Sequence, residues 1–340
     1  MNISWTEREM LETKKVCLNF DFSITENIAK KIGNKRIIFT GMGSSLLFPG
    51  KQAKNRALKF NISNKIEAYF ASDLFQYEDF CDTFVFLCSN SGKTKEVIML
   101  FDHIKKRNGK YIAITAVKDS LLAQKSDETI FLSCGFEKGV AATKSVMEQG
   151  LIYDSLVFHL ARNQGKGVDF DFLRKELNET AGFIEENINL RIPNNLLKAL
   201  TSSRNYYLVG LDNGVGEEIT LKVHEIARKL AVFYPDTHIS HGVAESIENG
   251  SLIVLQPSIF EPLLMDFDEF SKKINSQLIR MDNKSLDKGI EIKINETFSN
   301  YCLLAGGWGL LRSVANRLSL DIDHPEKISK VGNLYSEEHI

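Results

Sequence analysis

Two side chains between residues 222 and 241 are of types that proton-transfer chemistry uses. Glu225 is a carboxylate, and a carboxylate whose pKa is raised by burial can move a proton between neighbouring carbon atoms. His241 can give and take a proton near neutral pH. Lys222 lies one helical turn before Glu225, so we treat these residues as the candidate catalytic groups of the chain.

The element that must position Lys222 and Glu225 is a helix, which the apolar periodicity predicts from about Glu217 to Tyr234. The apolar stripe that should face the core consists of Ile219, Val223, Ile226, Leu230 and Phe233. A charged row runs along one flank and consists of Glu218, Lys222, Glu225 and Lys229. The row also fits ordinary surface pairs four residues apart, each worth roughly 0.2–0.5 kcal/mol.

A second candidate site is the segment Ser89-Asn90-Ser91-Gly92-Lys93-Thr94, which follows a predicted strand and precedes a helix that should begin near Lys95. A helix start offers backbone N–H groups to an anion, and the hydroxyls of serine and threonine can wrap a compact phosphate. Helix capping is the alternative explanation for one such hydroxyl. The segment does not complete the Walker A pattern, which argues against a nucleoside triphosphate.

The chain is predicted to belong to the α/β class, because short apolar runs alternate with helical segments. The predicted strands are Arg36–Thr40, Thr83–Cys88, Tyr111–Thr115 and Glu128–Leu132, then Tyr206–Gly210, Ser251–Leu255, Gln277–Met281 and Ile290–Ile294. Two longer helices are expected at Ala141–Arg162 and Phe172–Asn187. After the first strand, Leu46 replaces the third glycine of the dinucleotide-binding pattern that begins at Gly41, which argues against a Rossmann dehydrogenase.

These elements predict two similar units, each with a mostly parallel sheet flanked by helices. We expect a helical lead-in over residues 1–24, a first domain over 25–165, a linker and helix over 166–194, a second domain over 195–330 and a tail over 321–340. The length of 340 residues is ample for two domains.

The composition is that of a globular protein, with 43% hydrophobic and 25% charged residues. A net charge of −2 gives no sign of nucleic-acid binding. No apolar run reaches the ~20 residues of a membrane span, and the first residues lack the features of a signal peptide, so we expect a cytoplasmic protein without a membrane partner. The five cysteines are scattered and lie outside any zinc-binding spacing, so neither a metal nor a cofactor is expected.

The motifs resemble those of the sugar isomerase (SIS) domain family, and in particular the paired SIS domains that form the isomerase half of glucosamine-6-phosphate synthase and the free-standing glucosamine-6-phosphate deaminases and phosphosugar isomerases. The likeness covers roughly residues 25–332. The segment from Ser89 to Thr94 is similar to the family's Ser-x-Ser-Gly-x-Thr loop, and residues 139–144 are similar to its Gly-Val-Ala-Ser-Thr-Lys segment. The resemblance implies two tandem SIS domains of the flavodoxin-like, doubly wound type.

The resemblance also implies roles for individual residues. Glu225 would be the general base, Lys222 a supporting lysine, His241 the histidine that opens the sugar ring and Lys330 the active-site lysine of a closing tail. The sugar phosphate would be held by Ser45, Ser89, Asn90, Ser91 and Thr94, and the sugar by Gly43, Ser44, Val140 and Ala141. Three further residues have no settled role: His224, which we expect to be structural or at an interface, His238 and Glu137.

The implied reaction is aldose–ketose isomerisation of a sugar phosphate, with glucosamine 6-phosphate converted to fructose 6-phosphate and ammonia released or taken up. The likeness does not include a glutaminase domain, so we expect an isomerase without its own nitrogen source. Lys330 would stabilise the oxyanion or form an imine. Val331-Gly332-Asn333-Leu334 departs from the usual last residues of the family.

Two alternatives stay open at this point. A deglycase that cleaves 6-phosphorylated fructosamines would use the same base and histidine, although Lys330 favours an isomerase or deaminase. A sugar-phosphate sensor would keep the phosphate loop but can dispense with the base, the histidine and the lysine, which are all present here. The family resemblance further implies a homodimer with active sites at the subunit interface, where His241 is donated by the neighbouring chain.

Overall fold

The protein folds into two units of similar design. The structure, a computed structural model, describes residues 3–247, 249–256, 261–284 and 289–336. By their contacts, residues 15–174 group with 326–340, which we call the first unit. Residues 1–14 group with 175–325, which we call the second unit. Each unit therefore includes a short segment from the opposite end of the chain.

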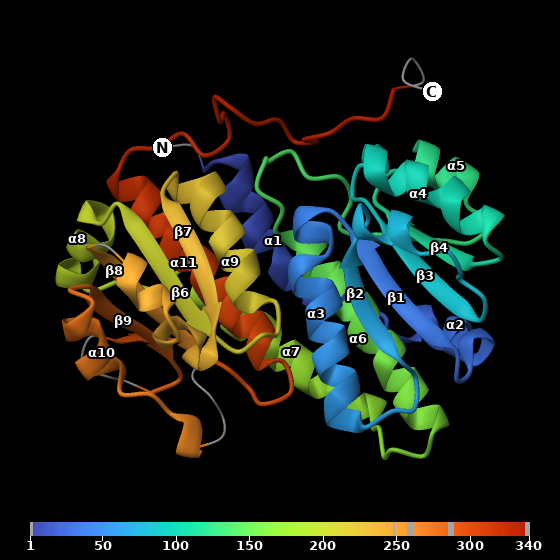
Figure 1. Ribbon diagram of the computed structural model, residues 1–340, viewed down its shortest axis with the longest axis horizontal. Helices are drawn as coiled ribbons and strands as arrows, with labels where there is room; N and C mark the ends of the chain where they lie inside the picture. Colours follow the sequence, from blue (N-terminus) through green and yellow to red (C-terminus); the bar gives the residue numbers. More distant parts are fainter. Residues whose placement is uncertain (1–2, 248, 257–260, 285–288, 337–340) are drawn as a thin grey trace. The chain divides into compact units, whose positions relative to one another are not determined.

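The first unit is built on a parallel sheet of five strands in the order β2-β1-β3-β4-β5 (Figure 1). Its strands are β1 Arg36–Gly41, β2 Ile66–Phe70, β3 Thr83–Cys88, β4 Lys110–Thr115 and β5 Thr129–Phe131. Every residue of β3 is buried, as a strand covered on both faces requires. After β1 the chain crosses to β2 on one side of β1, and after β2 it crosses to β3 on the other side of β1. The switch point of the sheet therefore lies between β1 and β3.

Helices cover both faces of this sheet. They are α2 Glu26–Ile32, α3 Leu47–Phe60, α4 Lys95–Lys106, α5 Leu121–Lys125 and α6 Lys144–Asn163. The α6 helix is buried from Lys144 to Ala161, so it forms the centre of the unit and packs against α2 and α3. On the other side, α4 adds Val97, Leu100 and Ile104 to the core beneath β3.

The second unit repeats this layout with the strand order β7-β6-β8-β9-β10. Its strands are β6 Asn205–Gly210, β7 Leu230–Pro235, β8 Gly250–Gln256, β9 Gln277–Asp282 and β10 Gly289–Glu291. The α-helices of this half of the chain are α7 Phe170–Ile188, α8 Asn194–Ser202, α9 Val215–Lys222, α10 Phe267–Lys273 and α11 Ser299–Arg317. The two parallel sheets flanked by helices confirm the predicted α/β class.

The α11 helix crosses α9 at a very short distance. A side chain at Gly307 would bring its Cβ within 2.4 Å of Ile219 Cδ1, so only glycine allows this approach. Close contact with α11 covers the apolar side of α9, where Ile219, Val223 and Ile226 are all buried. This part of the predicted apolar stripe is confirmed.

The predicted helix from Glu217 to Tyr234 is wrong in its second half. The helix α9 ends at Lys222, a π-helical turn follows at Val223–Ala227, and the chain then enters strand β7. Leu230, which was expected in the core, is 61% exposed. Arg228 has a φ of 53°, a left-handed conformation that breaks the helical path, and the β-prone run of residues 230–235 continues as an edge strand.

The first turn of the α1 helix, Trp5–Asn19, is capped by a carboxylate from near the C-terminal end of the chain. The backbone N–H groups of Trp5 and Thr6 donate to the carboxylate of Asp323 at 2.6 Å and 3.0 Å, and the Thr6 hydroxyl donates to it at 2.8 Å. A carboxylate at a helix N-terminus satisfies free N–H groups and interacts favourably with the helix dipole. Arg228 also donates to the backbone carbonyl of Asp321. These bonds fix the start of the C-terminal segment within the second unit.

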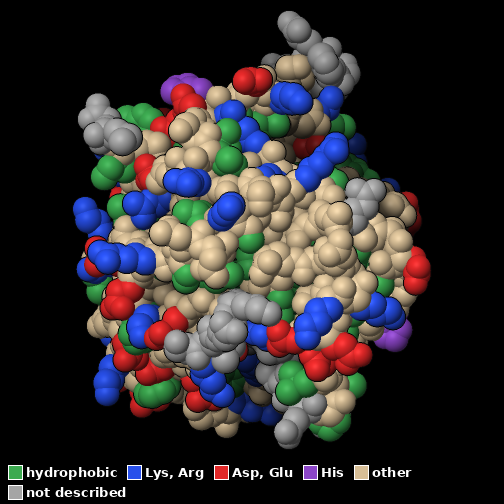
Figure 2. All heavy atoms as spheres, turned by 90° about the vertical axis from the view of Figure 1, so that its left-hand side faces the viewer, with side chains coloured by type: hydrophobic (Ala, Val, Ile, Leu, Met, Phe, Trp, Pro, Cys, Tyr) green, Lys and Arg blue, Asp and Glu red, His purple; other side chains and the backbone are tan. Residues whose placement is uncertain are grey.

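The surface carries charges of both signs. On the face drawn in Figure 2, basic and acidic side chains of the described residues lie interspersed, in keeping with a net charge of −2. Among the helices that the structure describes, none has both the length and the apolar content needed to cross a bilayer.

Candidate functional site

The two predicted phosphate-binding segments meet at the switch point of the first sheet. The turn Gly43–Ser45 follows β1, and the segment from Ser89 follows β3, so both start at the carboxyl ends of neighbouring strands. A Cβ atom built at Gly41 would lie 2.9 Å from the carbonyl oxygen of Ser45 and 3.0 Å from that of Cys88. The backbone of the two segments is therefore in close contact around Gly41. Ligands bind at such switch points in open α/β sheets.

Three hydroxyls gather in the segment after β3. Ser89 Oγ lies 2.8 Å from Thr94 Oγ1 and 3.5 Å from Ser91 Oγ, and the N–H of Lys93 donates to Ser91 Oγ at 3.2 Å. Ser89 and Ser91 are buried, and Thr94 is half-buried. Thr94 is the N-cap residue of α4, but its hydroxyl caps none of that helix's N–H groups. Helix capping, the alternative explanation, therefore does not account for Thr94.

Asn90 lies between these serines, and its side-chain amide is shielded from solvent. Neither its Oδ1 nor its Nδ2 has a hydrogen-bond partner among the residues that the structure describes. A buried amide without partners costs free energy of about 1–3 kcal/mol, and a ligand with hydroxyl or phosphate oxygens would satisfy it. The backbone carbonyl of Asn90 is held by the N–H of Ala116 at 3.0 Å and by the Thr115 hydroxyl at 3.1 Å.

Gly92 allows this segment to turn into α4. It has a φ of +62°, and a Cβ atom at this position would lie 2.2 Å from Ser120 Oγ. Both the backbone conformation and the missing side chain are required, because any other residue would be strained and would push the segment off α5. The N–H of Leu122 donates to the Gly92 carbonyl at 3.3 Å, which fixes the turn on the next loop.

Gln149 supports the turn after β1, and the sequence reasoning missed it. Its Nε2 donates to the Ser45 carbonyl at 2.6 Å and to the Tyr153 hydroxyl at 3.1 Å, and both Gln149 and Tyr153 are buried. Tyr153 in turn stacks on Phe39 of β1 with ring centroids 3.9 Å apart. The available signal was a polar residue spaced i, i+4 from a tyrosine in a predicted helix, which places both on the same face.

The segment of residues 137–145 surrounds a buried carboxylate. Glu137 is fully buried and accepts bonds from the Thr143 N–H at 2.7 Å and the Ser145 hydroxyl at 2.5 Å, so it caps the start of α6. Lys330 of the C-terminal segment donates to the carbonyl of Gly139 at 2.7 Å and lies 3.5 Å from Glu137. Lys330 is thus brought to the segment that carries Val140 and Ala141, of which Ala141 is buried and Val140 half-buried.

In the second unit, the charged row of α9 is buried. Lys222 and Glu218 are 0% exposed, and Glu225 is 17% exposed. Lys222 Nζ lies 3.1 Å from Glu218 Oε1 and 2.7 Å from Glu225 Oε2. Burial would lower the pKa of Lys222, but the two carboxylates outweigh it and raise that pKa, so the ammonium keeps its charge. We call Glu218, Lys222 and Glu225 the buried triad.

Of the two surface pairs that the alternative explanation expected, Glu218 with Lys222 forms but is fully buried, and Glu225 with Lys229 does not form. Glu225 pairs with Lys222 and not with Lys229, whose ammonium donates to the carbonyls of Thr201 and Ser203. Glu225 lies in the π-helical turn of Val223–Ala227, which brings it three residues after Lys222 to the same ammonium. π-Helical turns are frequent at functional sites because they re-aim a side chain. The Glu225 side chain stays partly accessible to solvent in this turn.

The three histidines of this region are exposed. His241 ends a 3₁₀-helix at Asp236–Ser240, and its N–H donates to the His238 carbonyl at 3.0 Å. Neither ring nitrogen of His241 has a hydrogen-bond partner in the described part of the chain. His224, His238 and His241 all have exposed side chains. Within the second unit, the described residues show no contact between His241 and Glu225.

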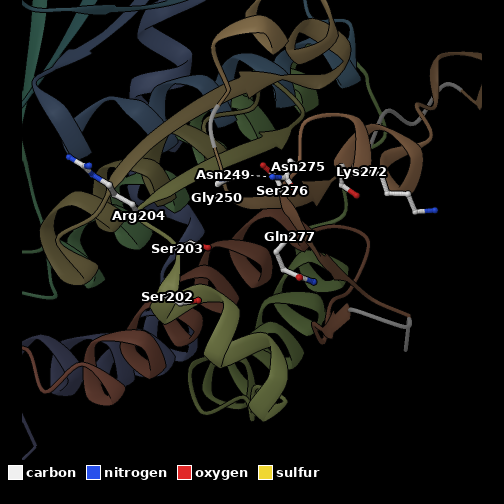
Figure 3. A pocket seen from close by; sticks show the side chains of 10 residues that line it. Ser202, Ser203, Arg204, Asn249, Gly250, Lys272, Asn275, Ser276 and Gln277 are labelled. Atoms are coloured by element: carbon white, nitrogen blue, oxygen red, sulfur yellow. Dashed lines mark hydrogen bonds between the residues drawn. The ribbon is translucent and has the colours of Figure 1, made fainter.

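A large hollow of the second unit lies elsewhere. It has a volume of about 670 Å³ and is formed at the amino ends of β6, β8 and β9, opposite the edge to which the buried triad's helix connects (Figure 3). Arg204 and Lys272 extend away from each other in this view, so no cationic centre forms. The hydroxyls of Ser202, Ser203 and Ser271 donate to backbone carbonyls of their own helices. This hollow does not contain any of the residues that the sequence predicted for catalysis or sugar binding.

The described residues contain no group of three or more histidine, cysteine or carboxylate side chains that could hold a metal ion. The side chains at the two candidate positions differ in kind. The first unit offers neutral hydroxyl and amide groups with backbone N–H groups, and the second unit offers a carboxylate held by a buried ammonium.

A comparison with known protein families matches the part of the chain that contains the hydroxyl cluster of the first unit. Residues 32–158 match the SIS domain family. The first unit contains a SIS domain. The matched range includes both strand ends with their loops, from Gly41 to Ser45 and from Ser89 to Thr94, and most of α6.

Relatives extend this likeness beyond the SIS domain of the first unit. The glutamine–fructose-6-phosphate aminotransferase (isomerizing) of Thermococcus kodakarensis is 26% identical over 278 residues, which are 77% of this chain and 45% of that protein. The chain thus spans under half the length of this curated relative. The same enzyme of Clostridium perfringens is 27% identical over 254 residues, 72% of this chain and 40% of that protein.

Two solved structures share the fold of both units. The C-terminal domain of glucosamine-fructose-6-phosphate aminotransferase from Francisella tularensis has a TM-score of 0.78 at 19% identity, covering 95% of this chain and 98% of that one. Glucosamine-6-phosphate deaminase from Thermotoga maritima has a TM-score of 0.71 at 21% identity, covering 97% and 100%. The fold likeness therefore includes the second unit as well as the first.

Proposed function

We propose that the protein is a phosphosugar isomerase that converts glucosamine 6-phosphate and water into fructose 6-phosphate and ammonia, or runs this reaction in reverse. Ring opening gives an aldehyde at C1 beside the amine at C2. Moving a proton from C2 to C1 through an enolamine gives a ketimine at C2, and water hydrolyses the ketimine to the ketone and ammonia. Relatives whose names describe aminotransferase and deaminase reactions on these sugars support the proposal.

The observation that carries the proposal is the Lys222–Glu225 pair. Proton transfer between two carbons needs one carboxylate that is kept in place and partly shielded from water. Glu225 is 17% exposed and lies 2.7 Å from an ammonium that is fully buried. Lys222 is enclosed and bound to Glu218 as well, so we assign it the role of positioning Glu225 and no contact with substrate.

For the phosphate group we propose Ser45, Ser89, Asn90, Ser91 and Thr94 as ligands, with Gly43, Ser44, Val140 and Ala141 beside the sugar. The cluster of three hydroxyls and the amide of Asn90 without partners support this assignment. Lys330 would act next to the carbonyl carbon, as an oxyanion partner or as an imine-forming amine. Its ammonium already lies on the segment before Val140, at 2.7 Å from the Gly139 carbonyl.

We propose His241 as the group that opens the sugar ring by exchanging a proton with the ring oxygen. Its exposed position supports a further proposal, that the protein acts as a homodimer in which His241 serves the active site of the neighbouring subunit. In a dilution series, activity per chain should then fall together with the dimer fraction measured by sedimentation. Full activity of the monomer would contradict this part.

The test is the release of ammonia and fructose 6-phosphate from glucosamine 6-phosphate by the wild type and by Glu225→Gln. The variant should lose at least about 100-fold in kcat while it still binds fructose 6-phosphate in calorimetry. His224→Gln is the matched control, because His224 is exposed on the same turn. A wild type that binds the ester without turnover would favour the sensor, and cleavage of a 6-phosphofructosamine instead would favour the deglycase.

A further inference from the structure

The last described residues of the chain pair with the start of α4. The N–H of Lys95 donates to the carbonyl of Asn333 at 3.1 Å, and the N–H of Tyr335 donates to the carbonyl of Lys93 at 3.0 Å. These two bonds form an antiparallel bridge between Thr94 and Leu334. The Asn333 side chain adds a bond to Glu96 Oε1 at 2.9 Å. We call residues 333–335 the clasp.

The clasp accepts a hydrogen bond from a backbone N–H group that has no partner within α4. The first N–H groups of a helix have no partner within the helix and are commonly satisfied by the side chain of the N-cap residue. Thr94 is the N-cap residue of α4, but its hydroxyl is bonded to Ser89 Oγ. The Asn333 carbonyl takes the N–H of Lys95 in its place. The clasp therefore caps α4 and allows the Thr94 hydroxyl to stay with the hydroxyl cluster.

The clasp lies three residues after Lys330, which is the candidate active-site lysine. Lys330 is 19% exposed and contacts Gly139 and Glu137, whereas the residues between Pro325 and Lys330 are mostly exposed and make few contacts. If the chain were held by hydrogen bonds on only one side of Lys330, the lysine could adopt several rotamers and backbone positions. The two backbone bonds of the clasp fix the other side.

We propose that the clasp is a positioning element that holds Lys330 against the Gly139 carbonyl, next to the substrate. The proposal rests on the proposed function, because it needs Lys330 to act in catalysis. Its consequence is that the backbone donor of Tyr335 contributes to turnover although Tyr335 itself touches no reacting atom.

The experiment compares Tyr335→Pro with Tyr335→Ala in the full-length chain. Proline removes the N–H that donates to Lys93, whereas alanine keeps it. Tyr335→Pro should lower kcat for glucosamine 6-phosphate about tenfold relative to Tyr335→Ala, with less than about a threefold change in KM, because a misplaced catalytic group affects the chemical step. Lys327→Ala is the outer control, since Lys327 is exposed and has no hydrogen bond or ion pair within the described ranges.

A double-variant series tests whether the clasp acts through Lys330. In a Lys330→Met background, Tyr335→Pro should cause no further loss of kcat beyond that of Tyr335→Ala. An equal loss in both backgrounds would overturn the proposal, as would equal kcat values for the two Tyr335 variants.

Hydrogen exchange supplies a readout that is independent of activity. The amide of Lys95 should exchange faster in Tyr335→Pro than in Tyr335→Ala, as judged from the peptides that contain Lys95, because residue 335 of the proline variant has no amide hydrogen of its own. Unchanged exchange would mean that the clasp does not form. Failure of the Glu225→Gln test with faster exchange here would instead refute the proposed reaction and leave the docking of the tail intact.

Discussion

The two sheets have the same strand order, yet the corresponding loops and helices carry different chemistry. At the ends of β1 and β3, the first unit presents hydroxyls, an amide and backbone groups, all of them neutral. In the second unit, the helix that follows β6 and the π-helical turn after it carry two carboxylates, each paired with the same ammonium. A repeated fold thus fixes where a site can lie, and the residue types decide whether it binds an anion or moves a proton.

The difference has a physical reason. A phosphate dianion brings its own charge, and several neutral donors can hold it without the cost of burying a protein cation. Proton transfer needs a protein group that changes its charge state, and such a group is tuned by a neighbouring charge. Three predictions would break or sharpen this comparison.

The largest effect is expected from Lys222→Met, which removes the ammonium of the buried triad. Glu218 is fully buried, so its carboxylate would be left without its cation, and the free energy of unfolding should fall by about 3–5 kcal/mol. Turnover should fall as well, because Glu225 loses the group that holds it. Urea unfolding and kcat measure the two effects. The Glu218→Gln, Lys222→Met double variant should regain part of the stability, and a single variant as stable as the wild type would contradict the triad.

A smaller effect is expected in the neutral loop. Thr94→Val removes one hydroxyl of the cluster and keeps the shape of the side chain, so KM for glucosamine 6-phosphate should rise about 5- to 10-fold, the equivalent of one hydrogen bond of about 1–1.5 kcal/mol. The value of kcat should change by less than about twofold. Thr94→Ser is the matched control, because it keeps the hydroxyl. Equal KM values for the two variants would remove Thr94 from the phosphate site.

The smallest effect concerns pH. Burial lowers the pKa of His159 on α6 in the first unit, and the bond to the Phe22 carbonyl offsets this only in part. A depressed histidine pKa adds stability above the ordinary value of about 6.5 and loses it as pH falls towards the folded-state pKa. The raised pKa of Lys222 instead keeps its ammonium charged throughout this range.

Hydrogen exchange between pH 7.5 and pH 5.5, corrected for the intrinsic pH dependence, can separate the two units. Peptides around α6 should lose protection on acidification, and those around α9 should not. His159→Gln should weaken the pH dependence around α6. An unchanged pH dependence in this variant would rule out His159 as its source.

The strands that the sequence predicted best are those buried on both faces. The prediction for β3 matches the observed range Thr83–Cys88, because a run of six apolar or β-prone residues is typical of a strand that is buried on both faces. The edge strands β2 and β7 were missed. The β2 strand, Ile66–Phe70, contains a glutamate and is half-exposed, and β7 follows a helical pattern without a glycine or proline to mark the break.

The contacts of the candidate site were only partly predictable. Hydroxyls after a strand and before a helix could be recognised, because a local pattern determines their position. The bond from Gln149 to the Ser45 carbonyl and the pairing of residues 333–335 with α4 join segments about 100 and 240 residues apart. Such contacts depend on how helices pack and carry no local sequence signal.

The Asp323 carboxylate at the start of α1 has a consequence for biosynthesis. The two partners are 318 residues apart, so at about 5–20 residues per second the ribosome makes Asp323 roughly 15–60 seconds after Trp5. During that time α1 has only its own capping residues, Ser4 and Glu7. Residues 15–174 can complete their sheet meanwhile. The bonds from Asp323 to the start of α1 can therefore form only after the middle of the chain has been synthesised.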